Sequence, residues 1–178
     1  MRLLAISGSL RAQSLNTAAL RVCAALARAP TVVTLYDGVA GLPAFNPDDE
    51  QAMRRGDPAV AALNAAVDQA DGFLFAVPEY AHGVPGALKN LLDWLVGHEN
   101  FAGKPTALIN VAPRASYADT SLREILSTMA AGIVAEACVK LPLAGRAWAP
   151  SEILADAACR APLEAMIAAI EAAVRARR

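Results

Sequence analysis

Short apolar runs alternate along this chain with segments of helical periodicity, and that alternation restricts the fold more than any other feature. Five runs are predicted to be strands, at residues 3–6, 31–36, 72–77, 105–111 and 133–141. The first, third and fourth are almost continuously apolar, as is typical of parallel strands covered by helices on both faces. The second and fifth are more mixed, so we expect them at the edges of the sheet.

Between these runs the apolar spacing becomes that of a helix. Apolar residues recur at helical intervals over four stretches, residues 60–67, 88–95, 122–129 and 163–174. A further helix is expected directly after the first strand. Strands that alternate with helices in this way predict an α/β fold, a doubly wound parallel sheet with helices on both faces.

Size, charge and cysteine content narrow the class of protein. The 178 residues are expected to form a single domain, residues 1–178. A net charge of −1 provides no basic excess for a nucleic-acid partner, and no apolar run is long enough to span a membrane. Cys23, Cys138 and Cys159 lie far apart with no histidine at metal spacing, which predicts buried thiols, no metal site and a reducing cytoplasm.

The first strand leads into a polar segment, residues 7–17, that ends at a predicted helix. It holds a single glycine, so it is neither a Walker loop nor a dinucleotide fingerprint. Ser9 and Ser14 can donate hydroxyl hydrogen bonds and Arg11 adds charge, next to the positive end of a helix dipole. Taken singly, Ser14 or Asn16 would serve as an N-cap and Arg11 as a solvated charge. Taken together after the first strand, they predict a phosphate site.

The third strand ends in a second polar loop, residues 78–85, before the 88–95 helix. In a sheet of strand order 2-1-3-4-5, strands one and three flank the topological switch point, so this loop and the segment 7–17 line one crevice. Tyr80 can offer a flat face to an aromatic ring. The alternatives are that Tyr80 only packs, that Glu79 is a charge favoured by the helix dipole, and that His82 is a loop imidazole with no task.

These segments resemble two motifs of the NADPH-dependent FMN reductase family. Residues 8–16 read Gly-Ser-Leu-Arg-x-x-Ser-x-Asn, and residues 78–94 read Pro-Glu-Tyr-x-x-Gly-x-Pro-Gly-x-Leu-Lys-Asn-x-x-Asp-Trp. A weaker resemblance covers residues 42–48. The family includes quinone, azo-dye and chromate reductases, and the resemblance implies a flavodoxin-like fold of five parallel strands in the order 2-1-3-4-5.

The resemblance also implies a role for each matching position. The phosphate of non-covalently bound FMN would be held by four residues, Ser9, Arg11, Ser14 and Asn16. The isoalloxazine and ribityl chain would run along the loop after the third strand, largely through backbone groups of Pro78, Glu79, Tyr80, Ala81 and His82. The helix carrying Lys89, Asn90, Asp93 and Trp94 would lie at or near an interface of a homodimer or homotetramer, with plain core packing an equal alternative for Trp94.

The implied activity is that of an FMN-dependent NAD(P)H oxidoreductase. Hydride would pass from NADPH or NADH through FMN to a small acceptor such as a quinone, a flavin, an azo compound or chromate. Because hydride transfer needs no general base, no catalytic side chain is assigned. The alternatives are a flavodoxin-like electron carrier, which we would expect to be more acidic, a divergent member without flavin, and a phosphate-ester or nucleotide-binding enzyme on the same fold.

Two positions depart from the family pattern. Ala81 stands where the family usually has Asn, which removes a side-chain hydrogen bond but leaves the backbone contact. The loop after the fourth strand, residues 110–117, contains no glycine where relatives often carry a glycine-rich turn. Because Pro113 cannot imitate the positive φ and close approach of glycine, we expect altered flavin affinity or pocket shape. Arg114 is a candidate to replace the lost donors or to bind a nicotinamide-nucleotide phosphate.

Overall fold

The computed structural model describes residues 1–51 and 56–177. The strands are β1 (Arg2–Ser7), β2 (Val32–Tyr36), β3 (Gly72–Ala76), β4 (Pro105–Asn110), β5 (Gly132–Ile133) and β6 (Val139–Lys140). The helices are α1 (Leu15–Leu26), α3 (Pro58–Gln69), α4 (Gly86–Leu95), α5 (Tyr117–Thr128), α6 (Pro150–Ala155) and α7 (Ala157–Arg177). Two short 3-10 helices are η1 (Gly38–Gly41) and η2 (Ala135–Ala137).

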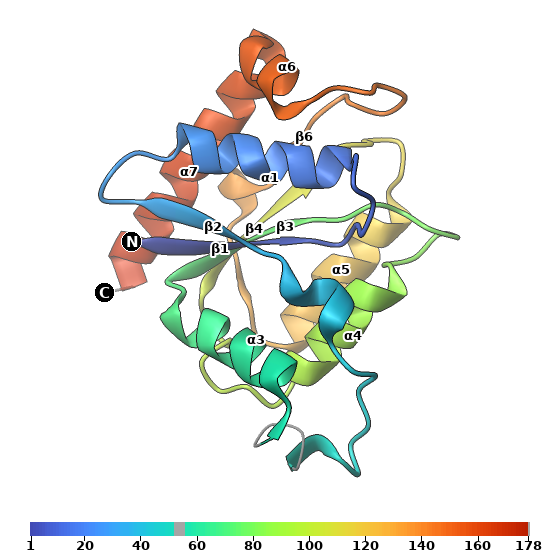
Figure 1. Cartoon of the computed structure of the whole chain (residues 1–178). Helices are drawn as coiled ribbons and strands as arrows, with labels where there is room; N and C mark the ends of the chain where they lie inside the picture. The colour runs from blue at the N-terminus through green and yellow to red at the C-terminus, as the bar shows by residue number, and fades with distance from the viewer. Residues whose placement is uncertain (52–55, 178) are drawn as a thin grey trace.

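The strands form one sheet in the order β2-β1-β3-β4-β5, and β6 also pairs with β4. Every pairing is parallel. Because β1 lies between β2 and β3, the chain winds outward in both directions from the gap between β1 and β3 (Figure 1). The predicted flavodoxin-like fold is therefore confirmed, and the carboxyl ends of all strands meet at one edge.

The fifth position of the sheet differs from its prediction. Residues 133–141 were expected as one strand, but η2 divides them into β5 and β6. β5 pairs with the start of β4 through Thr106 and Ile133, and β6 pairs with its end through Ile109 and Val139. The chain between Ile133 and Val139 is longer than the stretch of β4 that it accompanies, so the surplus residues coil into η2.

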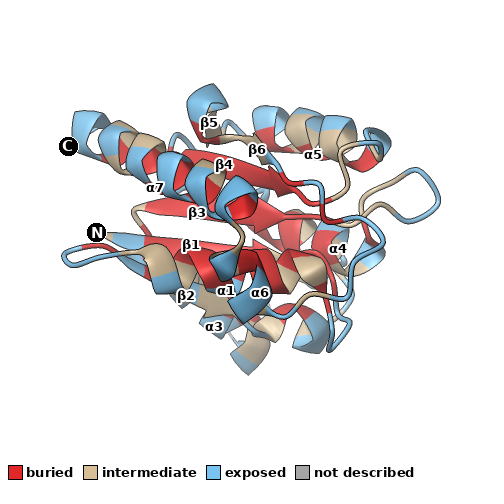
Figure 2. Cartoon of the chain, turned by 90° about the horizontal axis from the view of Figure 1, so that it is seen from above, coloured by how far each residue is buried: buried red, intermediate tan, exposed pale blue. Residues whose placement is uncertain are grey.

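Helices cover both faces of the sheet. α1, α6 and α7 pack on one face, and α3, α4 and α5 pack on the other (Figures 1 and 2). Successive residues of β1 alternate between the two layers, since Leu3 and Ala5 join the first core while Leu4 and Ile6 join the second. Because residues on both faces of β1 are buried, the strand reads as a continuous apolar run.

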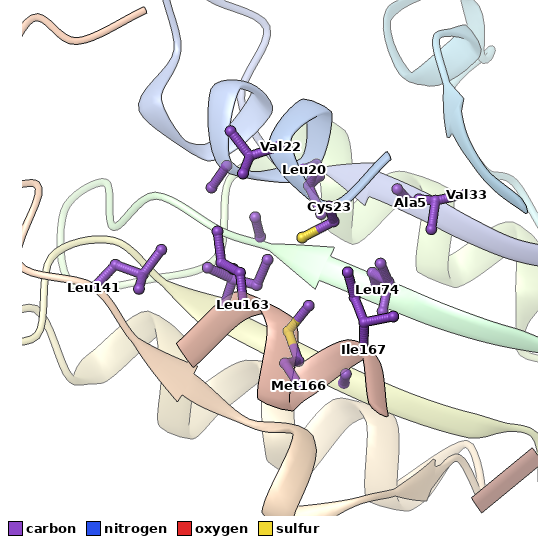
Figure 3. Packing of buried hydrophobic residues seen from close by; sticks show 14 of the residues in the cluster. Ala5, Leu20, Val22, Cys23, Val33, Leu74, Leu141, Leu163, Met166 and Ile167 are labelled. Atoms are coloured by element: carbon purple, nitrogen blue, oxygen red, sulfur yellow. The ribbon is translucent and has the colours of Figure 1, made fainter. Parts of the chain in front are cut away.

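The core on the α1 and α7 side encloses a cysteine (Figure 3). Cys23 of α1 points toward the sheet near Met166 of α7, and burial raises the pKa of its thiol to about 12. Cys159 is buried as well, and burial raises its pKa, whereas Cys138 is only half-buried. The prediction of buried free thiols is thus right for two of the three cysteines.

The four predicted helical stripes lie in α3, α4, α5 and α7, whereas α6 was not predicted. Pro85, the last residue of the predicted loop 78–85, is the N-cap of α4. In the described ranges, no helix has the length and apolar character needed to cross a membrane.

Candidate functional site

Two adjoining cavities open at the carboxyl edge of the sheet, where the loops after β1, β3, β4 and β6 converge. The wide cavity has a volume of about 500 Å³ and the narrow cavity one of about 280 Å³. Residues shared by both linings are Asn16, Pro78, Val111, Ala112 and Ala144. The crevice predicted at the switch point between β1 and β3 is therefore present.

The loop after β1, residues 7–17, is held by its own hydroxyl groups. The Ser7 and Thr17 hydroxyls lie 2.8 Å apart, and the Ser9 backbone N–H donates to Ser7 Oγ at 3.2 Å. Ser14 is the N-cap of α1 and accepts from the Thr17 backbone N–H at 3.3 Å. Ser14 also lines the wide cavity, so its capping role and its predicted binding role are compatible.

The side chain of Asn16 is buried without a complete set of partners. It is 5% exposed and lines both cavities. Its amide oxygen is buried and has no hydrogen-bond partner among the described residues. Because an unsatisfied buried polar atom is costly, this geometry indicates a place for a polar ligand group.

The loop after β3 contains a strained tight turn. Tyr80 and Gly83 exchange backbone hydrogen bonds of 3.2 and 3.0 Å, and Ala81 and His82 between them have φ values of 48° and 58°. This left-handed region disfavours residues with a Cβ, although Asn tolerates it better than Ala. The turn presents Tyr80, which is 50% exposed, to the wide cavity.

Contacts of Glu79 and His82 join the β3 loop to the start of α5. Glu79 Oε2 accepts from the Ala118 backbone N–H at 3.0 Å. This contact matches the alternative interpretation of Glu79 as a charge favoured by a helix dipole, but the helix is α5 rather than α4. The His82 ring stacks on Tyr117 with 4.3 Å between centroids and 19° between planes, so this imidazole has a definite packing partner.

The loop after β4, residues 110–117, closes without glycine. The buried Asn110 side chain accepts from the Ala112 backbone N–H at 2.8 Å and donates to the Ala115 carbonyl at 3.1 Å. No residue of this loop has a positive φ. Arg114 is exposed and lines neither cavity, unlike Ala112, which lines both, so the geometry of the two cavities does not support the binding role suggested for Arg114.

The nine predicted site residues fall into three groups. Six of them line the wide cavity, and two of these six also line the narrow one: Ser9, Arg11, Ser14, Asn16, Pro78 and Tyr80, of which Asn16 and Pro78 line both. Glu79 lines the narrow cavity only. Ala81 and His82 line neither cavity. They form the middle of the tight turn that presents Tyr80 to the wide cavity.

The predicted set omits a wall of the wide cavity formed between β6 and α6. This segment overhangs the N-terminal end of α1 (Figure 1) and contributes Arg146 and Trp148 to the lining, to which α1 contributes Arg21. The Arg146 guanidinium lies 4.0 Å from the centroid of the Trp148 ring. One signal was available in the sequence, because the segment follows the predicted fifth strand and so begins at the same edge of the sheet.

The two cavities differ in charge. The wide cavity is lined by Arg11, Arg21 and Arg146 and by no carboxylate. The narrow cavity is lined by Glu79 and Asp119 and by no cation. Among the described residues no cluster of His, Cys, Asp and Glu is suited to a metal ion. The wide cavity is therefore suited to anions.

The third motif, residues 42–48, packs on α4. Asn90 accepts from the Phe45 backbone N–H at 2.8 Å and donates to the Pro43 carbonyl at 2.9 Å. Trp94 is fully buried and donates its indole N–H to the same carbonyl at 2.9 Å. Trp94 is thus a core residue in this chain, and Lys89 and Asp93 pair with each other on the exposed side of α4.

Comparison with known proteins places this site in context. The sequence profile of a family described as NADPH-dependent FMN reductase matches residues 1–145. A probable NADPH:quinone oxidoreductase 1 of Oryza sativa subsp. japonica is 40% identical over 113 residues, 62% of this chain and 57% of the relative. An NAD(P)H-dependent FMN reductase of Pseudomonas aeruginosa is 37% identical over 114 residues, 63% of this chain and 60% of the relative. The matches thus span less than two thirds of these curated relatives.

A solved structure extends the likeness over the whole chain. The flavoenzyme NAD(P)H:(acceptor) oxidoreductase FerB from Paracoccus denitrificans superimposes with a TM-score of 0.74 at 26% identity. The superposition covers 98% of this chain and 97% of FerB.

Proposed function

This chain belongs to the NADPH-dependent FMN reductase family, and we propose that it is an FMN-dependent NAD(P)H oxidoreductase. In this proposal hydride passes from NADPH or NADH, through non-covalently bound FMN, to a small-molecule acceptor. The observation that carries the proposal is the hydroxyl-rich loop before α1, which opens into an arginine-lined cavity at the switch point of the sheet. Ligands of doubly wound folds bind at this place.

The residues present fit FMN. Ser9, Ser14 and Arg11 would hold its phosphate at the N-terminal end of α1, where free backbone N–H groups and the helix dipole favour an anion. Asn16 offers a buried amide with an unused oxygen to a polar group of the flavin or its side chain. Pro78 and Tyr80 would flank the ring from the β3 loop.

When bound, FMN supplies the ring that accepts and returns the hydride. The chain's own tasks are to hold the phosphate, to orient the ring and to exclude water from it. The Glu79 and His82 contacts fix the β3 loop against α5, which keeps Tyr80 in place at the cavity. No side chain needs to move a proton for hydride transfer, and the Cys23 thiol is too buried to take part in redox chemistry.

We also propose a quinone as the first acceptor to assay, because the Oryza sativa relative reported above is named a probable NADPH:quinone oxidoreductase. The protein is proposed to act as a homodimer or homotetramer in the cytoplasm, without a nucleic-acid or membrane partner. The near-neutral charge speaks against a nucleic-acid partner, and the free cysteines fit a reducing compartment.

The test is to saturate the purified protein with FMN and then to add NADPH, or NADH, without oxygen. Loss of the absorbance of oxidised flavin at a rate far above that of free FMN, with recovery on adding a quinone, is the expected result. Saturable FMN binding without reduction would contradict the enzyme and support an electron carrier. Failure to bind FMN would indicate a divergent member that has lost its flavin.

A further inference from the structure

The wide cavity continues past the phosphate loop to a wall that the proposed FMN site does not use. Arg21, Arg146 and Trp148 line this part, together with the small residues Ala147, Ala149 and Pro150. We call Arg21, Arg146 and Trp148 the arginine-tryptophan wall. Arg21 belongs to α1, and Arg146 and Trp148 belong to the segment between β6 and α6, so no residue of the wall comes from the loops after β3 and β4.

The charge of this wall exceeds what one phosphate monoester requires. A phosphate monoester carries a charge of about −1.5 to −2 near neutral pH, and in the proposed FMN site Arg11 and the N-terminus of α1 would already face that charge. Arg21 and Arg146 add two further cations to the same cavity, whose lining has no carboxylate. Neither arginine forms an ion pair with a carboxylate of the described residues. The cavity therefore has unused capacity for a second phosphate group.

The wall also offers flat surfaces. Trp148 is half-buried, and the Arg146 guanidinium is stacked on it at 4.0 Å. Arg146 Nε donates to the Pro142 carbonyl at 3.2 Å, which fixes the plane of the guanidinium. Guanidinium planes and indole rings both stack on nucleobases, and a fixed guanidinium loses little freedom when a base binds.

We propose that the arginine-tryptophan wall is a subsite for an adenosine phosphate, with the base against the Arg146–Trp148 stack and the phosphate between Arg21 and Arg146. This assignment rests on the proposed function, because a dinucleotide whose other end meets the flavin is the ligand that would bring an adenosine phosphate here. The AMP half of the pyridine nucleotide and the AMP half of FAD share this chemistry.

The primary test is isothermal titration of adenosine 5′-diphosphate and of 2′,5′-ADP into the protein saturated with FMN. We expect saturable binding of at least one of them, weakened tenfold or more by Arg146→Gln and by Trp148→Ala. Arg114→Gln, a charge change on an exposed residue that lines neither cavity, is the matched control and should leave binding unchanged. No hydride transfer is measured, so this result is independent of whether the protein oxidises NADPH.

The source of the adenosine phosphate is distinguished by two further measurements. Two results together would identify the pyridine nucleotide as the source. 2′,5′-ADP would compete with NADPH, and Arg146→Gln would leave the KM for reduced nicotinamide mononucleotide unchanged. FAD would be identified as the source if the wild type binds FAD more tightly than FMN and Arg146→Gln binds the two flavins equally. Two results would overturn the subsite. One is the absence of saturable ADP binding by the wild type, and the other is equal binding by the wild type, Arg146→Gln and Trp148→Ala.

Discussion

The loops after β1 and β4 stand at the same edge of the sheet and line the same wide cavity, yet they use their polar groups differently. In the loop after β1 the Ser7 and Thr17 hydroxyls bond each other and Ser14 Oγ accepts from the Thr17 backbone N–H, while the buried amide oxygen of Asn16 has no partner among the described residues. In the loop after β4 the amide of Asn110 is bonded at both its oxygen and its nitrogen to the loop itself.

One loop keeps a buried polar atom available for a ligand, whereas the other uses its buried amide to hold its own backbone together. The β1 loop leaves polar capacity toward the cavity, whereas the β4 loop uses its buried amide to replace the turn that glycine would provide. A glycine-free sequence after β4 is therefore compatible with an intact site. Polar groups for a ligand would come from the β1 loop, and the β4 loop would supply a rigid wall.

The largest effect should come from opening the β4 loop. Asn110→Ala removes two hydrogen bonds of a residue that is 5% exposed and leaves the Ala112 N–H and Ala115 carbonyl without partners. We expect the free energy of unfolding in urea to fall by about 2–4 kcal/mol. Asn46→Ala is the matched control, because Asn46 also makes one donor and one acceptor bond but is exposed. Equal losses in the two variants would contradict the structural role of Asn110.

Next in size is the loss of the cation in the β1 loop. Arg11→Ala should weaken FMN binding by about 1.5–3 kcal/mol, the scale of a charged hydrogen bond, in a flavin fluorescence titration. Arg114→Ala removes the same charge from the β4 loop, where it lines neither cavity, and should leave the Kd within a factor of about two. The comparison between the loops fails if the two variants lose affinity equally.

A smaller effect distinguishes capping from binding. Ser14→Ala and Asp57→Ala each remove the N-cap of a helix, α1 and α3, and each should lower the free energy of unfolding by about 1 kcal/mol. Because only Ser14 lines the wide cavity, only its variant should also raise the Kd for FMN. An unchanged Kd in Ser14→Ala would leave this serine with a structural role alone.

The smallest expected effect concerns the β3 turn. Ala81→Gly removes a Cβ from a residue with φ of 48° and should raise the free energy of unfolding by about 0.5–1 kcal/mol, measured in urea. Ala44→Gly is the control, since Ala44 lies in a loop without positive φ and should lose stability instead. A loss in both variants would show that the turn is not strained.

Local sequence patterns were sufficient to predict most strands of the sheet. β1, β3 and β4 are apolar because both faces are covered, and this burial is visible in the sequence as continuous hydrophobicity. The position of the polar segment before α1 was also predictable, because its hydroxyls and arginine follow directly after a buried strand. The strand order itself followed from the resemblance to the family rather than from any spacing.

Features that depend on partners distant in the sequence were not predictable. The break in residues 133–141 follows from the register against β4, which no local pattern encodes. Glu79 reaches α5 rather than α4, and Trp94 meets Pro43 across 51 positions of sequence. The arginine-tryptophan wall was missed because its segment has no periodicity, although it begins at the functional edge of the sheet.

The measurement that tests the central claim most directly compares FMN with riboflavin, which lacks the phosphate, in fluorescence titrations of the apoprotein. If the loop after β1 holds the phosphate, FMN should bind at least about 100-fold more tightly than riboflavin, as expected for several charge-assisted hydrogen bonds. The same preference should shrink at least tenfold in Arg11→Ala. Equal affinity of the wild type for the two flavins would contradict the assignment of this loop.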